Sequence, residues 1–178
     1  MADFFNALEQ KHIDFISAQQ MFFVATAPKQ GRINLSPKGL DCFRIISPTE
    51  VAYLDFVGSG NETAAHLLDD GRITVMFNSY TRNALILRIY GRGTSHAPGS
   101  ARFADLMKMF DDAPGIRQIF TIAIDNLQTS CGYGVPIFET GEERLTLTKW
   151  AEKKGPKGIE DYFQKRNQIS IDGLPSVK

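Results

Sequence analysis

Short apolar segments separated by turn residues recur along the first two thirds of the chain. They are rich in aromatic and β-branched residues, and some alternate apolar with polar positions, which is typical of β-strands with one buried face. Clusters of Pro, Gly, Ser and Asn between them indicate turns. The pattern predicts strands at 21–27, 32–38, 42–46, 51–56, 73–78, 84–94 and 117–127.

Three other segments have the apolar spacing of helices. Apolar residues between positions 4 and 20 recur at near-helical intervals, and Asp3 is the expected N-cap. Residues 62–69 predict a second, short helix, and Ser100 is expected to cap a third. Six or seven strands with few, peripheral helices predict a mainly β fold, a closed or nearly closed antiparallel barrel.

The chain is expected to form a single domain over residues 1–178, a length sufficient for one hydrophobic core. Its parts are an N-terminal helix at 4–20, a barrel at about 21–130 and a segment at 131–178 that covers the barrel. The last segment is richer in Gly, Pro and charged residues than the barrel, and a short helix is expected near Tyr162.

Composition excludes several classes of function. Twenty basic and twenty acidic residues cancel, so no nucleic-acid partner is expected. No apolar run approaches the roughly 20 residues that a membrane span requires, and the N-terminus does not resemble a signal peptide. The two cysteines, Cys42 and Cys131, form no C-x-x-C pair, so no metal site is expected and a cytoplasmic location is predicted.

The run 58–63, Gly-Ser-Gly-Asn-Glu-Thr, lies between a predicted strand and a predicted helix. A Gly-rich turn that opens a helix presents unpaired backbone N–H groups, which bind anions such as phosphate. A purely structural alternative is a capping box in which Ser59 caps the helix and Glu62 returns to the Ser59 N–H. The run matches neither a dinucleotide fingerprint nor a P-loop.

The predicted strand at 32–38 carries polar side chains on one face and ends in Lys38. One interpretation is a solvated outer face. The other is a face that meets a dianionic ligand, with Lys38 as the charge and Ser36 as a hydroxyl donor. Pro37 and Gly39 flank the lysine and would restrict its position.

Three further residues have side chains suited to a functional or an internal role. Arg88 lies in the middle of a predicted strand, where an arginine needs a partner, either a charged side chain, a second subunit or a ligand. His66 is expected at the surface or at an interface, and Cys131 as a buried structural thiol. No side-chain general base is identified, so catalytic residues are unknown.

The order of these elements resembles a known family. The runs 22–27, 34–39, 53–55, 58–67, 72–77 and 88–93 together resemble the pyridoxamine-phosphate oxidase-like family, whose members are flavin-binding split barrels. The resemblance covers roughly residues 15–130. The run 131–136 and the tail at 171–175 resemble a subgroup described as oxidase-related.

The resemblance implies a homodimer with FMN bound at each end of the subunit interface. Lys38 and Gly39 fall where the oxidases have a Lys-Gly beside the cofactor and substrate, and 59–63 falls at their phosphate-binding run. The predicted cofactor-binding residues are Ser36, Lys38, Gly39, Ser59, Gly60, Asn61, Thr63 and Arg88.

The chain also departs from the oxidase pattern. The Arg-Lys pair of the phosphate run is replaced at 60–62, Ile33 stands at an arginine position, and Ile86 at a glutamine position. Vitamin B6 oxidation is therefore not expected. The sequence predicts an FMN-dependent oxidoreductase of unknown substrate. The alternatives are a non-catalytic binding or regulatory module for haem, a deazaflavin or another phosphorylated ligand, and a structural homodimer with a vestigial cleft.

Overall fold

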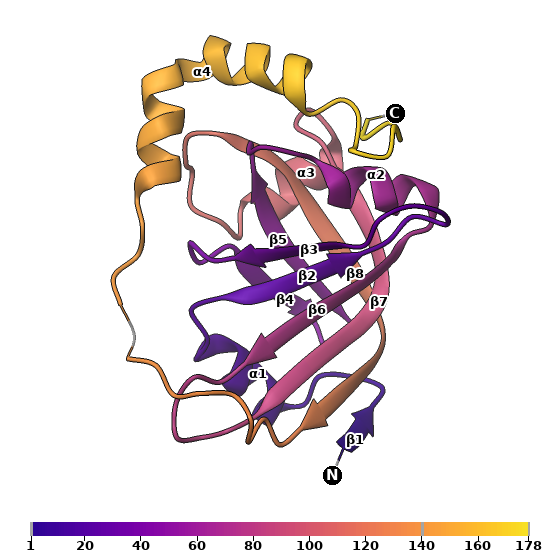
Figure 1. Cartoon of the computed structure of the whole chain (residues 1–178), viewed down its shortest axis with the longest axis vertical. Coiled ribbons are helices and arrows are strands. Elements are labelled where there is room, and N and C mark those ends of the chain that lie inside the picture. The colour runs from indigo at the N-terminus through magenta and orange to yellow at the C-terminus, as the bar shows by residue number, and fades with distance from the viewer. Residues whose placement is uncertain (1, 140, 178) are drawn as a thin grey trace.

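The computed structural model describes residues 2–139 and 141–177, and one antiparallel sheet of eight strands dominates it (Figure 1). The mainly β class is confirmed. The strands are β1 (Ala2–Phe5), β2 (Phe22–Thr26), β3 (Asn34–Lys38), β4 (Phe43–Ser47), β5 (Glu50–Phe56), β6 (Arg72–Asn78), β7 (Ile86–His96) and β8 (Ile116–Ser130). The helices are α1 (Gln10–Ser17), α2 (Glu62–Asp69), α3 (Ala101–Met107) and α4 (Thr146–Arg166).

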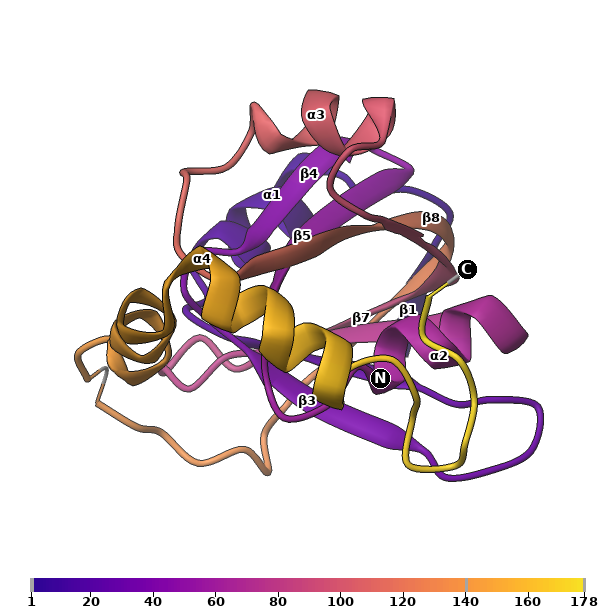
Figure 2. The same ribbon diagram turned by 90° about the horizontal axis from the view of Figure 1, so that it is seen from above.

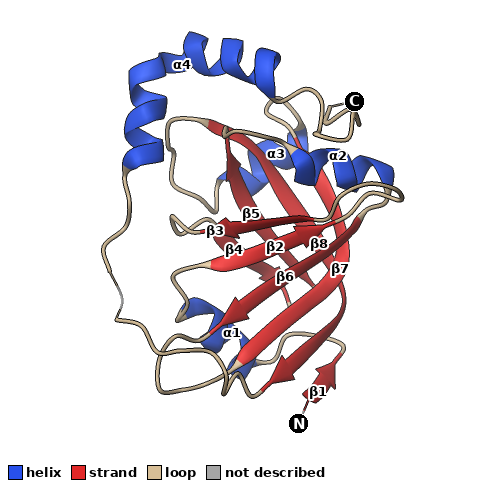
Figure 3. Ribbon diagram, in the orientation of Figure 1, coloured by secondary structure: helices blue, strands red, loops and turns tan. Residues whose placement is uncertain are grey.

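The sheet curls into a partly open barrel, and the long strand β8 is part of its wall (Figure 3). β8 pairs with β7 along its length, with β5 through its first half and with β1 at its end. The hydrogen-bonded order is β3-β2-β6-β7-β8-β5-β4, so β3 and β4 lie at the two ends of this series, and β1 lies off it beside β8.

The alternation of the strands determines which side chains enter the core. Leu87 and Ile89 of β7 are fully buried inside the barrel, whereas Arg88 and Tyr90 between them face outward. Aromatic rings fill the centre, with Tyr53 and Phe120 in tilted contact at 5.0 Å between ring centroids. Burial of each such large side chain contributes roughly 1.5–3 kcal/mol to the free energy of folding.

The N-terminal prediction was wrong in its first part. Residues 2–5 form β1, in which Phe4 lies opposite Gln128 of β8, and α1 begins only at Gln10 with Glu9 as N-cap rather than Asp3. Phe4 and Phe5 also fit the apolar spacing of a helix. However, β8 extends past the end of its pairing with β5, and its free backbone groups there pair with β1.

The C-terminal helix is longer than the sequence predicted. α4 contains two helical segments joined at a kink, where Gly155 has a positive φ of 64° directly before Pro156. Such a backbone favours glycine, and the proline cannot continue the first helix. Seen from above, α4 crosses the end of the barrel beside β3 and β5 (Figure 2). None of the described helices combines the length and apolarity that a bilayer crossing requires.

Candidate functional site

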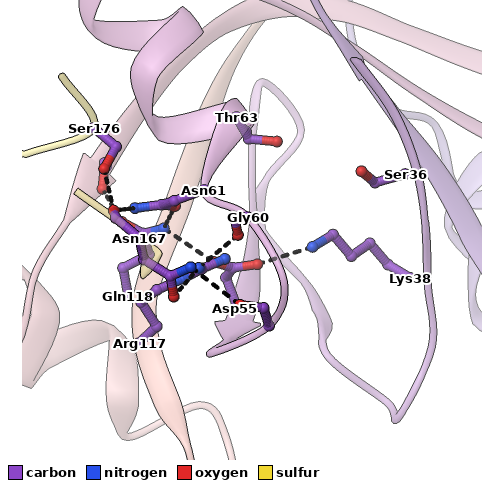
Figure 4. A network of polar contacts seen from close by, with 12 residues as sticks. Ser36, Lys38, Asp55, Gly60, Asn61, Thr63, Arg117, Gln118, Asn167 and Ser176 are labelled. Atoms are coloured by element: carbon purple, nitrogen blue, oxygen red, sulfur yellow. Dashed lines mark hydrogen bonds and ion pairs between the residues drawn. The ribbon is translucent and has the colours of Figure 1, made fainter. Parts of the chain in front are cut away.

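A hollow of about 360 Å³ lies between β3, the end of β5 and the turn that leads into α2. We call it the main hollow. In Figure 4 the side chains of Ser36, Lys38 and Thr63 flank one open space. Every predicted cofactor-binding residue except Arg88 lines this hollow: Ser36, Lys38, Gly39, Ser59, Gly60, Asn61 and Thr63.

The polar face of β3 turns toward the main hollow. Asn34, Ser36 and Lys38 are half-buried, whereas Leu35 between them is exposed, so the polar face of β3 borders the hollow and is not the outer face of the strand. Ser36 Oγ donates to Asn34 Oδ1 at 3.1 Å, and Asn34 Nδ2 donates to Thr63 Oγ1 at 3.3 Å. These bonds fix the strand against the start of α2.

A cluster of three charged residues forms one wall of the main hollow. Lys38 Nζ lies 2.8 Å from Asp55 Oδ1, and Arg117 Nε lies 2.9 Å from Asp55 Oδ2. Burial opposes ionisation of Asp55, but the charges of Lys38 and Arg117 outweigh it and lower the pKa of the carboxyl to about 2. Two cations and one carboxylate leave this wall with one positive charge in excess.

Arg117 and its neighbour Gln118 also hold the Gly-rich turn at residues 58–61, which we call the glycine turn. Arg117 Nη1 donates to Gly60 O at 2.8 Å, and Gln118 Nε2 donates to Asn61 Oδ1 at 2.7 Å. The sequence pattern singled out neither residue. For Arg117 the clue was a charged residue at the start of an apolar strand, whereas Arg88 lies in the middle of one; Gln118 carries no such clue.

The first turn of α2 has no side-chain cap. Asn61 is the N-cap, but its side chain bonds Gln118 and Asn167 instead of the helix backbone. Glu62 accepts from the backbone N–H of Ile171 at 3.1 Å. The predicted capping box is therefore wrong. Its absence leaves the first-turn N–H groups without a side-chain partner among the described residues, at the end of the helix that favours anions.

Arg88 and His66 lie away from the main hollow. Arg88 faces outward from β7, where Nη1 donates to Ser130 Oγ at 3.4 Å. His66 is buried rather than at the surface, and its Nδ1 lies 3.0 Å from Thr26 Oγ1. The expectation for His66 was wrong because its face of α2 packs against β2 and β7.

The expectation for the Cys131 thiol was wrong. Cys131, expected to be buried, is exposed after the end of β8. Cys42 is buried, and burial raises the pKa of its thiol to about 12, so it is inert at neutral pH. The described residues contain no group of three or more side chains that would hold a metal ion.

The arrangement suits a ligand with a phosphate ester and further polar groups. An ammonium group, the hydroxyls of Ser36, Ser59 and Thr63, and the amides at the start of α2 border one hollow. The acidic side chain of Asp55 is ionised and engaged by both neighbouring cations. The site is thus equipped to bind and orient a ligand rather than to remove a proton from it.

Comparison with known proteins gives a consistent result. Residues 8–131 match the sequence profile described as pyridoxamine 5'-phosphate oxidase. A curated relative is the pyridoxamine 5'-phosphate oxidase family protein ustO of Aspergillus flavus. It is 37% identical over an alignment of 195 positions, which covers 99% of this chain and 78% of ustO.

Solved structures share the fold at low sequence identity. HupZ from Group A Streptococcus matches with a TM-score of 0.54 and 20% identity, over 67% of this chain and 91% of that one. A candidate pyridoxamine 5'-phosphate oxidase from Lactobacillus delbrueckii matches at 0.57 and 13%, over 69% and 94%. An FMN-binding protein from Syntrophomonas wolfei matches at 0.50 and 13%, over 64% and 78%. These matches confirm the split-barrel fold.

Proposed function

Because the chain belongs to the pyridoxamine 5'-phosphate oxidase family, we propose that it is an oxidoreductase that binds FMN in the main hollow. One observation carries the proposal. Lys38 and the turn that opens α2, which are separated in the sequence, border the same hollow. A lysine, a set of hydroxyls and an uncapped helix start are the groups that a phosphate ester requires.

The protein's own residues bind and orient the ligand. Ser59, Thr63 and the first-turn amides of α2 donate to the phosphate, and Lys38 balances charge on the phosphate or on a flavin carbonyl. Asp55 holds Lys38 in place, and Arg117 keeps the turn in its observed shape through Gly60. Bound FMN supplies hydride or electron transfer, which no side chain in the main hollow provides.

We place Arg88 at a subunit contact of a homodimer rather than in the hollow of its own chain. It lies on the outward face of β7 beside Tyr90, whose hydroxyl donates to Gln128 at 3.1 Å. Both side chains are only half-buried, so a second copy has polar groups to contact there. A cytoplasmic location fits the two unpaired thiols, Cys42 and Cys131.

A non-catalytic binding module is the second candidate. The pairing of Lys38 with Asp55 supports it, because part of the charge available to a phosphate is already compensated within the protein. Such a module binds a phosphorylated or planar ligand, a deazaflavin or haem among them, and has no turnover.

Titration with FMN followed by flavin fluorescence tests the proposal. Wild-type protein should bind FMN. Lys38→Ala should weaken binding by about 1.5–3 kcal/mol, the contribution of a charged hydrogen bond. Lys11→Ala, which removes an exposed lysine distant from the hollow, should bind as the wild type does. NAD(P)H-driven reduction of the bound flavin distinguishes the enzyme from the module, and failure of the wild type to bind FMN would contradict both flavin-dependent activity and the site.

A further inference from the structure

A second hollow of about 530 Å³ adjoins the main one, and we call it the side hollow. The two share Asn34, Ser59, Gly60 and Glu62, so the glycine turn is a common wall between them. The remaining lining comes from the start of β3 and from the C-terminal segment, including Arg166. Side chains that line either hollow can therefore contact a ligand group bound at the turn.

One arginine that lines the side hollow has a side chain that pairs with no other described residue. Of its two arginines, Arg32 forms an ion pair with Asp172, which also accepts from the Arg32 backbone N–H at 2.7 Å. The side chain of Arg166, which is exposed, forms no hydrogen bond or ion pair with any residue that the structure describes. The free guanidinium thus lies on the same hollow as Ser59 and Gly60.

A second polar group on this hollow also lacks a partner. His66 is 1% exposed, and its Nε2 has no hydrogen-bond partner among residues 2–139 and 141–177. A buried polar atom without a partner is costly, so it points to a group that the protein alone does not supply. Arg166 and His66 both line the side hollow.

Asn167, the residue after Arg166, is fixed firmly to the glycine turn. It is fully buried, its Nδ2 donates to Gly58 O at 3.0 Å, and its Oδ1 accepts from Arg117 at 2.9 Å. Its carbonyl accepts from Asn61 Nδ2 at 3.3 Å and from the hydroxyl of Ser176 (Figure 4). The backbone that carries Arg166 is therefore held against the turn that opens α2.

The charge balance calls for such a residue. A phosphate ester carries up to two negative charges at neutral pH. Lys38 and Arg117 are balanced in the main hollow by Asp55 and Glu62, so these four side chains carry no net charge. One more cation at the turn would compensate one of the two phosphate charges.

We propose that Arg166 contacts the phosphate of the bound ligand from the side hollow and that Asn167 is the positioning residue that holds it there. The inference rests on the proposed function, since it names the phosphate contact of that same site. It assigns the C-terminal segment, which lies outside the strands of the barrel, to ligand binding.

Comparison of FMN with riboflavin, which lacks the phosphate, tests the inference. Arg166→Ala should weaken FMN binding at least tenfold and riboflavin binding less than twofold. Arg166→Lys should recover part of the FMN affinity, because it keeps the charge but not the fork geometry. Lys165→Ala, which removes a neighbouring charge that does not line the hollow, should leave both affinities unchanged.

Asn167→Ala gives a second readout. It should lower the ratio of FMN to riboflavin affinity, whereas a residue that only stabilises the fold would change both affinities alike. Equal losses for the two ligands in Arg166→Ala, or no loss beyond that of Lys165→Ala, would overturn the inference and leave the proposed function standing. Wild-type protein that binds neither ligand would overturn the proposed function itself.

Discussion

Lys38 Nζ lies 2.8 Å from Asp55 Oδ1, and this ion pair joins two strands that share no backbone hydrogen bonds. Lys38 ends β3, one edge of the sheet, whereas Asp55 belongs to β5, next to the opposite edge strand. Side chains rather than a backbone ladder therefore connect the two ends of the sheet at this point. The main hollow lies at this connection, so the stability of the barrel and the shape of the site depend on the same charges.

Asp55→Asn should destabilise the protein strongly. The substitution leaves Lys38 and Arg117 beside each other without a counter-charge, and the Arg117 side chain is only 6% exposed. Breaking a buried ion pair by removing one partner typically costs about 3–5 kcal/mol. Urea unfolding measures the change. Asp111→Asn, at an exposed position outside the network, is the control, and a loss no larger than that of the control would contradict the account.

The same carboxyl predicts an acid-dependent loss of stability. The pKa of Asp55 is about 2 in the folded protein and ordinarily 3.8, so the unfolded chain binds the proton more readily. Its contribution is complete above about pH 5 and is lost as the pH falls toward 2, a change of roughly 2–3 kcal/mol. Unfolding free energies of the wild type minus those of Asp55→Asn should show this slope, and parallel curves would be evidence against it.

Gly91→Ala should be among the most damaging substitutions in the barrel. A Cβ at this position would lie 2.2 Å from the carbonyl oxygen of Ala123 in β8, where the pairing of β7 and β8 shifts register. Forced separation of the strands should cost at least about 3 kcal/mol. Gly134→Ala, where no atom lies within 4 Å, is the matched control in thermal unfolding. Equal melting temperatures for the two variants would refute the expectation.

Glu62→Gln should strengthen FMN binding. The carboxylate lines both hollows and repels a phosphate, whereas glutamine removes the charge and retains an oxygen that can accept from Ile171. We expect a gain of about twofold to fivefold, the scale of a partly exposed charge interaction, with riboflavin affinity unchanged. Weaker FMN binding by this variant would indicate that Glu62 supports the ligand rather than opposing it.

Local patterns predicted the parts of the fold that depend on local spacing. The strand alternation placed most of the sheet, and Ser100 caps α3 as expected, accepting from Phe103 N at 3.2 Å. The capping box failed because a distant backbone group, the N–H of Ile171, binds Glu62 in place of the nearby Ser59. Local sequence cannot indicate that competition.

The candidate site was predictable where a motif carried it and unpredictable where it depends on long-range contacts. Lys38 and the glycine turn were identified as ligand-binding candidates from the residues next to them in the chain. Asn167 did not, because its partners Gly58 and Arg117 are distant in sequence and only the folded chain brings them together. The ion pair of Lys38 with Asp55 was not predictable either, because only the folded chain brings these two residues together.

Binding of FMN can be read from the absorbance spectrum of the purified, untreated protein, followed by mass spectrometry of the ligand released on denaturation. We expect flavin bands and release of FMN, or the appearance of flavin bands once FMN is added to colourless protein. A colourless protein that gains no flavin spectrum on addition of FMN would contradict this expectation.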